Sequence, residues 1–342
     1  MKLKRIGVDL AKQVFQIHGV DSHEQVKCRK QLKRSQMLDF FRQLEPCLVA
    51  MEACGGAHYW ARELIKLGHE VRLIAPQFVK PYVKSGKNDA NDAEAICEAA
   101  SRPTMRYVPV KSEEQQAALS VHRIRSRAIR ARTALVNEAR GLLAEFGLIE
   151  VRKGVKATRA LLAHVSQESG VLPVAMRELM GELRDALQEN DDRIAHLDRL
   201  IQQQASQDKR VQRLMKIEGV GPISATALVA AVGDARQFKS GRQLAAWLGL
   251  VPSQHSSGGK ERLGSISKRG DTYLRTLLIH GARAALTASA QKTDPRSTWI
   301  NELKCRRNTN IATVALANKN ARIIWALLSK DESYNPAACS TQ

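Results

Sequence analysis

The chain has 342 residues, and its 54 Lys and Arg against 34 Asp and Glu give a formal net charge of +20. This length predicts two domains with a helical element between them, each large enough to bury a core. The charge predicts a polyanionic partner, most commonly nucleic acid, because each phosphate that a cationic side chain neutralises releases counterions. A membrane surface is the rival partner, and it is disfavoured because the longest uncharged apolar stretches, such as residues 225–232, reach less than half of the roughly 20 residues that a spanning helix needs.

The N-terminus and the cysteines indicate the compartment. Asp9 and Lys12 interrupt what would be the apolar core of a signal peptide, so we expect a cytoplasmic, nucleoid-associated protein. The six cysteines include no C-x-x-C pair, which predicts reduced thiols without a zinc site or a disulfide framework. Aromatic residues make up 4% of the chain, which disfavours a protein that binds single strands by stacking bases.

The first hundred residues alternate between strand-like and helical patterns, which predicts an α/β domain. We expect strands at residues 4–8, 14–19, 25–31, 47–51 and 70–74, and helices at 35–44, 57–67 and 91–100. This order is typical of RNase H-like nucleases, in which three antiparallel strands precede a β-α-β-α continuation.

Four carboxylates in this region form a candidate metal site. Asp9 and Glu52 each end an apolar strand pattern, and in an RNase H-like sheet those strands are neighbours. Asp89 and Asp92 lie three residues apart at the start of a helix and so project from one face. One of these two aspartates could instead be an N-cap. Together the four acids predict a site for two divalent cations, with Mg²⁺ preferred because its ligands are hard oxygens.

The middle of the chain predicts two long helices. The first has an arginine-rich flank that we expect to contact phosphates, although a merely solvated face is the alternative. Its arginines are Arg123, Arg125, Arg127, Arg130, Arg132 and Arg140. The second follows Pro173 and carries apolar residues spaced alternately four and three apart, with Asn190 as one polar interruption. This heptad seam can pair with a second subunit or with the arginine-rich helix of its own chain, and the sequence leaves both open.

Two segments of the C-terminal part suggest phosphate contacts. The stretch IEGVGPISATALVAAVGD resembles a helix-hairpin-helix, in which Gly219 and Gly221 would let backbone N–H groups approach a phosphate; an ordinary turn between packed helices is the alternative. Further on, Ser256 and Ser257 stand in a polar loop between two helices. Such a loop can present a hydroxyl to a phosphate, or be a plain phosphate contact or linker. Its basic residues are Lys260, Arg262, Lys268 and Arg269.

The motifs GVDLAK, MEACG, KNDANDAEA, GVGPISA and GLVPSQHSSGGKERLGSISKRGD follow one another in this order. Over residues 4–327 the chain therefore resembles the DEDD insertion-sequence transposases, whose better-known members are bridge-RNA-guided recombinases. The resemblance implies a RuvC-like catalytic domain of RNase H type (1–110), a long basic helix and coiled-coil linker (111–207), and a mainly α-helical transposase domain with the helix-hairpin-helix and the serine loop (208–330). We expect residues 331–342 to be a disordered tail.

The resemblance also implies a mechanism. Asp9, Glu52, Asp89 and Asp92 would bind Mg²⁺, and Ser257 would attack a DNA strand to form a phosphoserine link, with Ser256 as a neighbouring alternative. The implied partners are donor and target duplex DNA, a structured non-coding RNA encoded by the element, and further copies of the chain in a dimer or tetramer. The two halves of each site would then come from different subunits.

Two other functions compete with this one. A structure-specific, metal-dependent endonuclease of the Holliday-junction resolvase type would use the same acids with water as the nucleophile. A non-catalytic architectural protein or RNA chaperone would use only the hairpin and the arginine helix. The acid cluster disfavours the second alternative, because without metal it would repel phosphate.

Overall fold

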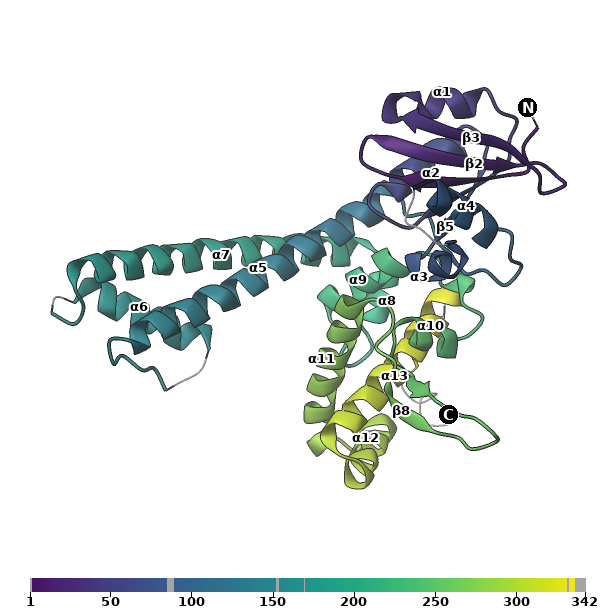
Figure 1. Ribbon diagram of the computed structural model, residues 1–342. Coiled ribbons are helices and arrows are strands. Elements are labelled where there is room, and N and C mark those ends of the chain that lie inside the picture. The colour runs from purple at the N-terminus through teal and green to yellow at the C-terminus, as the bar shows by residue number, and fades with distance from the viewer. Residues whose placement is uncertain (1, 85–88, 152–153, 169, 331, 336–342) are drawn as a thin grey trace. The chain divides into compact units, whose positions relative to one another are not determined.

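The computed structural model describes residues 2–84, 89–151, 154–168, 170–330 and 332–335. The chain folds as two compact units, Met1–Glu114 and Gln115–Gln342 (Figure 1). The predicted boundary at residue 110 falls close to this division, and the further boundary predicted at residue 207 stays a prediction. Of the predicted tail, residues 331 and 336–342 lie outside the described residues.

The first unit is built on a six-stranded sheet with the order β3-β2-β1-β4-β5-β6. The strands are β1 Arg5–Leu10, β2 Val14–Val20, β3 Val26–Lys33, β4 Leu48–Glu52, β5 Glu70–Ile74 and β6 Tyr107–Val108. The first three are antiparallel, β1, β4 and β5 are parallel, and β6 pairs antiparallel with β5. The five predicted strands are thus confirmed within two residues, whereas the short β6 was not predicted. The mixed topology is consistent with a DEDD nuclease-like fold.

Helices cover both faces of this sheet, because successive side chains of β1 and β4 point to opposite faces and consecutive residues of both strands are buried. The helices of this unit are α1 Met37–Arg42, α2 Ala57–Lys66, α3 Pro76–Val79 and α4 Asp89–Ala99, with 3₁₀ turns η1 Arg34–Gln36 and η2 Lys80–Tyr82. Apolar residues of α1 and α2 pack with Ile6, Val8 and Phe15 on one face. On the other face α4 packs with Ala50 and Ile74.

The second unit contains a long helical hairpin. Its helices are α5 Glu113–Ala144, which begins two residues before the unit boundary, α6 Val155–Gln167 and α7 Val174–Gln207. Both predicted long helices are confirmed. Arg125 pairs with Asp198 and Arg132 with Asp191, so α5 and α7 run antiparallel, side by side (Figure 1).

The heptad seam of α7 is buried within its own chain. Met180 and Leu187 join Val136 and Leu143 of α5 and Leu162 of α6 in one apolar cluster. The polar interruption is accommodated because Asn190 Nδ2 donates a 2.8 Å hydrogen bond to the backbone carbonyl of Ala128. Of the two partners that the sequence leaves open, the structure therefore has the arginine-rich helix.

The rest of the second unit is mainly helical, with Leu228, Leu244, Leu278, Leu316 and Ile324 in its core. It comprises α8 Lys209–Leu214, α9 Pro222–Val232, η3 Ala235–Gln237, α10 Gly241–Trp247, β7 Pro252–Gln254, β8 Leu263–Ile266, α11 Thr272–Ala288, η4 Ser289–Gln291, α12 Pro295–Arg306 and α13 Thr309–Ser329. Among the described residues, no helix combines the length and the apolar character that crossing a membrane requires.

Candidate active site

Three of the four predicted acids meet where β1 ends and α4 begins. Carboxylate oxygens of Asp9, Asp89 and Asp92 all lie within 4.8 Å of one another. Gly7 makes this possible, because a Cβ at this position would lie 2.2 Å from the carbonyl oxygen of Ala93 and 2.5 Å from the backbone nitrogen of Cys97. The backbone of α4 thus rests directly on β1, which brings the first turn of the helix beside Asp9.

The fourth acid, Glu52, ends β4, the parallel neighbour of β1. The register pairs Val8 with Met51, so Glu52 follows beside Asp9 at the carboxyl ends of both strands. Its oxygens are not part of the group of three within 4.8 Å, but its charge helps to raise the pKa of Asp9, and Asp92 helps to raise the pKa of Glu52. The structure therefore gathers all four predicted acids at one edge of the sheet.

The electrostatics of this cluster are repulsive. Burial, followed by the charges of Asp92, Asp89 and Glu52, raises the pKa of Asp9 to about 6. Burial is also the main reason why the pKa of Glu52 is raised. Within the described parts of the chain, no Lys, Arg or His forms an ion pair with any of the four carboxylates.

The donor set fits a divalent cation. Ligands on opposite sides of an octahedral Mg²⁺ are about 4.1 Å apart, so oxygens within 4.8 Å of one another need only small side-chain movements to bind one. Carboxylates are the ligands that Mg²⁺ prefers, and a doubly charged ion would offset the repulsion that raises the pKa of Asp9.

Cys54 is a neighbour of the site that the sequence analysis did not single out. It lies two residues after Glu52 and is partly buried. Burial, with the charges of Glu52 and Asp9, raises the pKa of its thiol. A neutral thiol is a poor nucleophile, so this cysteine is no rival of the serines.

The serine segment lies in the second unit between two helices, α10 and α11, as predicted, but it contains two strands that were not predicted. The segment is a two-stranded antiparallel hairpin of β7 and β8. At its tip Ser257 bridges to Lys260 across Gly258 and Gly259, whose φ angles are +57° and +75°. Positive φ at both central residues is what a type I′ turn needs, and glycine adopts it without strain.

The two candidate serines have different environments. Ser256 Oγ accepts hydrogen bonds from Gln254 Nε2 at 3.0 Å and from the backbone N–H of Arg262 at 3.1 Å, so it ties the two strands together. The side chain of Ser257 is exposed, and its hydroxyl makes no hydrogen bond to another described residue. The basic residues predicted beside it are exposed as well: Lys260, Arg262, Lys268 and Arg269.

The predicted helix-hairpin-helix is a turn between α8 and α9. Gly219 has a φ of +84°, and a Cβ there would lie 2.4 Å from the carbonyl oxygen of Gly281 in α11, so internal packing already explains this glycine. Gly221 is exposed at the N-terminus of α9 with open space around its Cα. Of the two glycines, only Gly221 therefore has exposed backbone that a phosphate could contact.

The arginines of α5 divide into two groups. Arg125 and Arg132 form the ion pairs that join α5 to α7, and Arg140 donates to the carbonyl of Glu150 at 2.9 Å. The others are exposed and form no ion pair with the described residues: Arg123, Arg127 and Arg130. This second group is free to contact an external anion.

Comparison with known proteins agrees with these features. A family model described as the Transposase IS116/IS110/IS902 family matches residues 211–296, and one described as Transposase matches residues 6–147. A probable family 20 transposase of Pseudomonas aeruginosa is 68% identical over 337 residues, which cover 98% of this chain and 100% of the relative. The transposase for insertion sequence element IS1111A of Coxiella burnetii is 47% identical, over 98% of this chain and 92% of its own. The transposase for insertion sequence element IS1328 of Yersinia enterocolitica is 41% identical, over 95% and 96%. The chain therefore belongs to the IS110/IS116 family of insertion-sequence transposases, enzymes that cleave and rejoin DNA.

Proposed function

We propose that this transposase excises and inserts its element through a phosphoserine intermediate on Ser257, with Asp9, Glu52, Asp89 and Asp92 holding divalent metal. The observation that carries the proposal is the difference between the two serines. Both side chains are exposed, but Ser256 Oγ accepts two hydrogen bonds within the hairpin, whereas the Ser257 hydroxyl makes none to another described residue. A nucleophilic hydroxyl must be able to turn towards its phosphate, and of these two serines only Ser257 has a hydroxyl without a hydrogen bond to another described residue.

The proposed chemistry conserves a phosphodiester at every step. Ser257 Oγ attacks the phosphorus and loses its proton to solvent, while the bond to one bridging DNA oxygen breaks and that oxygen takes up a proton. A DNA hydroxyl can later attack the phosphoserine in the reverse sense, so rejoining needs no nucleotide cofactor. Metal bound at the acids would stabilise negative charge on the phosphate.

The charge of the second unit supports the proposed partners. Exposed Arg123, Arg127 and Arg130 on α5 and the basic residues around Ser257 suit the backbones of donor DNA, target DNA and a structured RNA from the element. In the proposed reaction the RNA selects the DNA by base pairing, while the protein contacts backbone and shape. We also propose a dimer or tetramer in which different subunits supply the acids and the serine of one site.

A covalent protein–DNA adduct tests the proposal. Purified protein, Mg²⁺ and RNA transcribed from the flanks of the element are incubated with labelled donor and target DNA, and the products are run on a denaturing gel. We expect an adduct with the wild type and with Ser256→Ala, and none with Ser257→Ala or Asp9→Asn. Omission of the RNA should abolish the adduct if the RNA directs the strand choice.

The same gel distinguishes the endonuclease alternative, which the acid cluster alone would support. Water activated at the acids cuts DNA without leaving protein attached to it. Cleaved DNA without adduct, lost in Asp9→Asn but unchanged in Ser257→Ala, would replace the serine mechanism by hydrolysis.

A further inference from the structure

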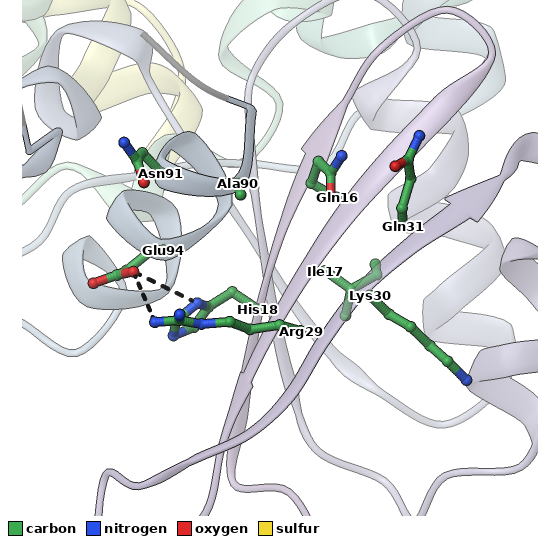
Figure 2. Close-up of a pocket in the computed structure, with 9 residues that line it drawn as sticks. All are labelled: Gln16, Ile17, His18, Arg29, Lys30, Gln31, Ala90, Asn91 and Glu94. Atoms are coloured by element: carbon green, nitrogen blue, oxygen red, sulfur yellow. Dashed lines mark hydrogen bonds and ion pairs between the residues drawn. The ribbon is translucent and has the colours of Figure 1, made fainter. Parts of the chain in front are cut away.

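A polar pocket lies beside the acid cluster in the first unit. It has a volume of about 200 Å³ and lies between β2, β3 and the first turns of α4. Figure 2 shows its polar lining, with Gln16 and Gln31 pointing to the same side from adjacent strands and Glu94 facing His18 and Arg29. The motifs of the sequence did not indicate this pocket.

The sheet register connects the pocket to the metal site. Asp9 pairs with Gln16 across β1 and β2, and Gln16 pairs with Gln31 across β2 and β3. Directly paired residues project from the same face of a sheet, so the three side chains form one row. Neighbouring strands are about 4.8 Å apart, which places Gln31 roughly 10 Å from Asp9. One strand of duplex DNA advances about 3.4 Å along the helix axis per nucleotide, so a row of this length that runs along the axis spans two to three nucleotides.

The two amides in this row have unused hydrogen-bonding capacity. Gln16 is partly buried and Gln31 is exposed, and neither side chain makes a hydrogen bond to another described residue. Each amide offers two N–H donors and one carbonyl acceptor. They can therefore bind phosphate and sugar oxygens without adding a charge next to the metal site.

The charge around the pocket also suits a nucleic-acid strand. Its one lining carboxylate, Glu94, pairs with Arg29 at 3.3 Å and with Lys84, which holds the pKa of that carboxyl below its usual range. The ammonium of Lys30 lies over the ring of Phe40 on the other face of the sheet and adds no charge to the pocket. Arg29 and Lys84 together outweigh the charge of Glu94 by one, although the pocket adjoins four acids.

We propose that this pocket binds the DNA strand being cut, with Gln16 and Gln31 holding its sugar–phosphate backbone two to three nucleotides from the scissile phosphate. A strand that reaches the acids from the side of β2 and β3 crosses this row, because the row ends at Asp9. The inference rests on the proposed function, since it takes the acid cluster as the place of cleavage.

The test is a binding measurement on the full-length protein with its RNA, in Ca²⁺ so that no cleavage occurs. The probe is a DNA fragment that carries the end of the element, with one methylphosphonate at a time replacing a phosphate. In the wild type we expect weakened binding when the replacement is two to three nucleotides from the cut. The double variant Gln16→Ala, Gln31→Ala should bind unmodified DNA roughly tenfold more weakly, as expected from two lost neutral hydrogen bonds, and should lose sensitivity at that position.

Gln202→Ala is the matched control, because Gln202 is exposed on α7 and makes no hydrogen bond to another described residue. It should behave as the wild type. If the double variant fails to fold, Gln31→Ala alone replaces it, since Gln31 is exposed on the edge strand β3 and should show about a threefold loss.

The outcomes separate this inference from the proposed function. A wild type that cuts DNA, together with a double variant of unchanged affinity and unchanged methylphosphonate pattern, overturns the inference alone. A wild type that gives no adduct but shows the position-specific weakening, lost in the double variant, supports the pocket and rejects the serine mechanism.

Discussion

Replacing Asp9 by Asn should make the metal-free protein more stable while it abolishes activity. Asn has nearly the shape of Asp but no charge to be repelled by Glu52, Asp89 and Asp92. The pKa of Asp9 is about 6 in the folded protein against about 3.9 in an unfolded chain, a difference of roughly 2 units or nearly 3 kcal/mol. Because Asp9 is only partly buried, we discount this to about 1–2 kcal/mol for screening by solvent.

The pH dependence of this effect has a definite sign. Between about pH 4 and pH 6 the folded state keeps a proton on Asp9 that the unfolded state has lost, so the wild type loses stability as the pH rises through this window. The advantage of Asp9→Asn should therefore be complete above pH 6 and vanish below pH 4. His122 changes the pH dependence of stability in the opposite direction, because burial lowers its pKa to about 4. Since both proteins contain His122, its contribution cancels in the difference between their stabilities.

The assay is urea unfolding of the wild type and Asp9→Asn in EDTA at pH 8 and pH 4. The quantity measured is the unfolding transition of the first unit. A wild type that equals or exceeds the variant in stability at pH 8 would refute the reasoning. Addition of Mn²⁺ at pH 8 should reverse the order, because only the wild type retains the full set of ligands. A variant that gains as much stability from Mn²⁺ as the wild type would show that Asp9 is not a ligand.

Three other changes have expected outcomes. Gly7→Ala should push α4 away from β1 and abolish stabilisation by Mn²⁺ in thermal unfolding, even where the protein still folds. Gly219→Ala should cost more than about 2 kcal/mol, since its φ of +84° and its contact with α11 both resist a Cβ, and denaturant unfolding would measure the loss. Asp191→Ala should cost about 1–3 kcal/mol of unfolding free energy, because this largely buried carboxylate pairs with Arg132 and Arg159; a loss below 0.5 kcal/mol, on the order of a surface change, would contradict it.

The strands of the sheet could be predicted from the sequence because the burial of their side chains determines which residue types they contain. β1, β3 and β5 approximately alternate apolar and polar residues, and β4 is a short apolar run; both patterns are visible without a structure. The hairpin of β7 and β8 was missed because its strands are largely exposed and carry no such alternation. It is held by the glycine turn and by the hydrogen bonds of Ser256, and neither leaves a periodic signal.

The sequence also could not predict which helix packs against α7. A heptad seam shows which residues are buried, but it does not identify the helix that buries them. The choice of α5 depends on particular contacts, namely Arg125 with Asp198 and Asn190 with the carbonyl of Ala128. The pocket beside Asp9 was missed for a similar reason, since Gln16 and Gln31 belong to no motif and become neighbours only through the register.

The acids of α4 have two different surroundings, and the difference points to a metal at the acid cluster. Glu94 lies two residues after Asp92 and is surrounded by Arg29, Lys84 and His18, the arrangement by which a protein ordinarily accommodates a partly buried carboxylate. Asp92 and its neighbours have no such partner among the described residues, although the chain carries a net charge of +20. Four acids without cations destabilise the fold, so a function must retain them. A divalent ion supplies the missing positive charge and places it where a phosphate would be cut.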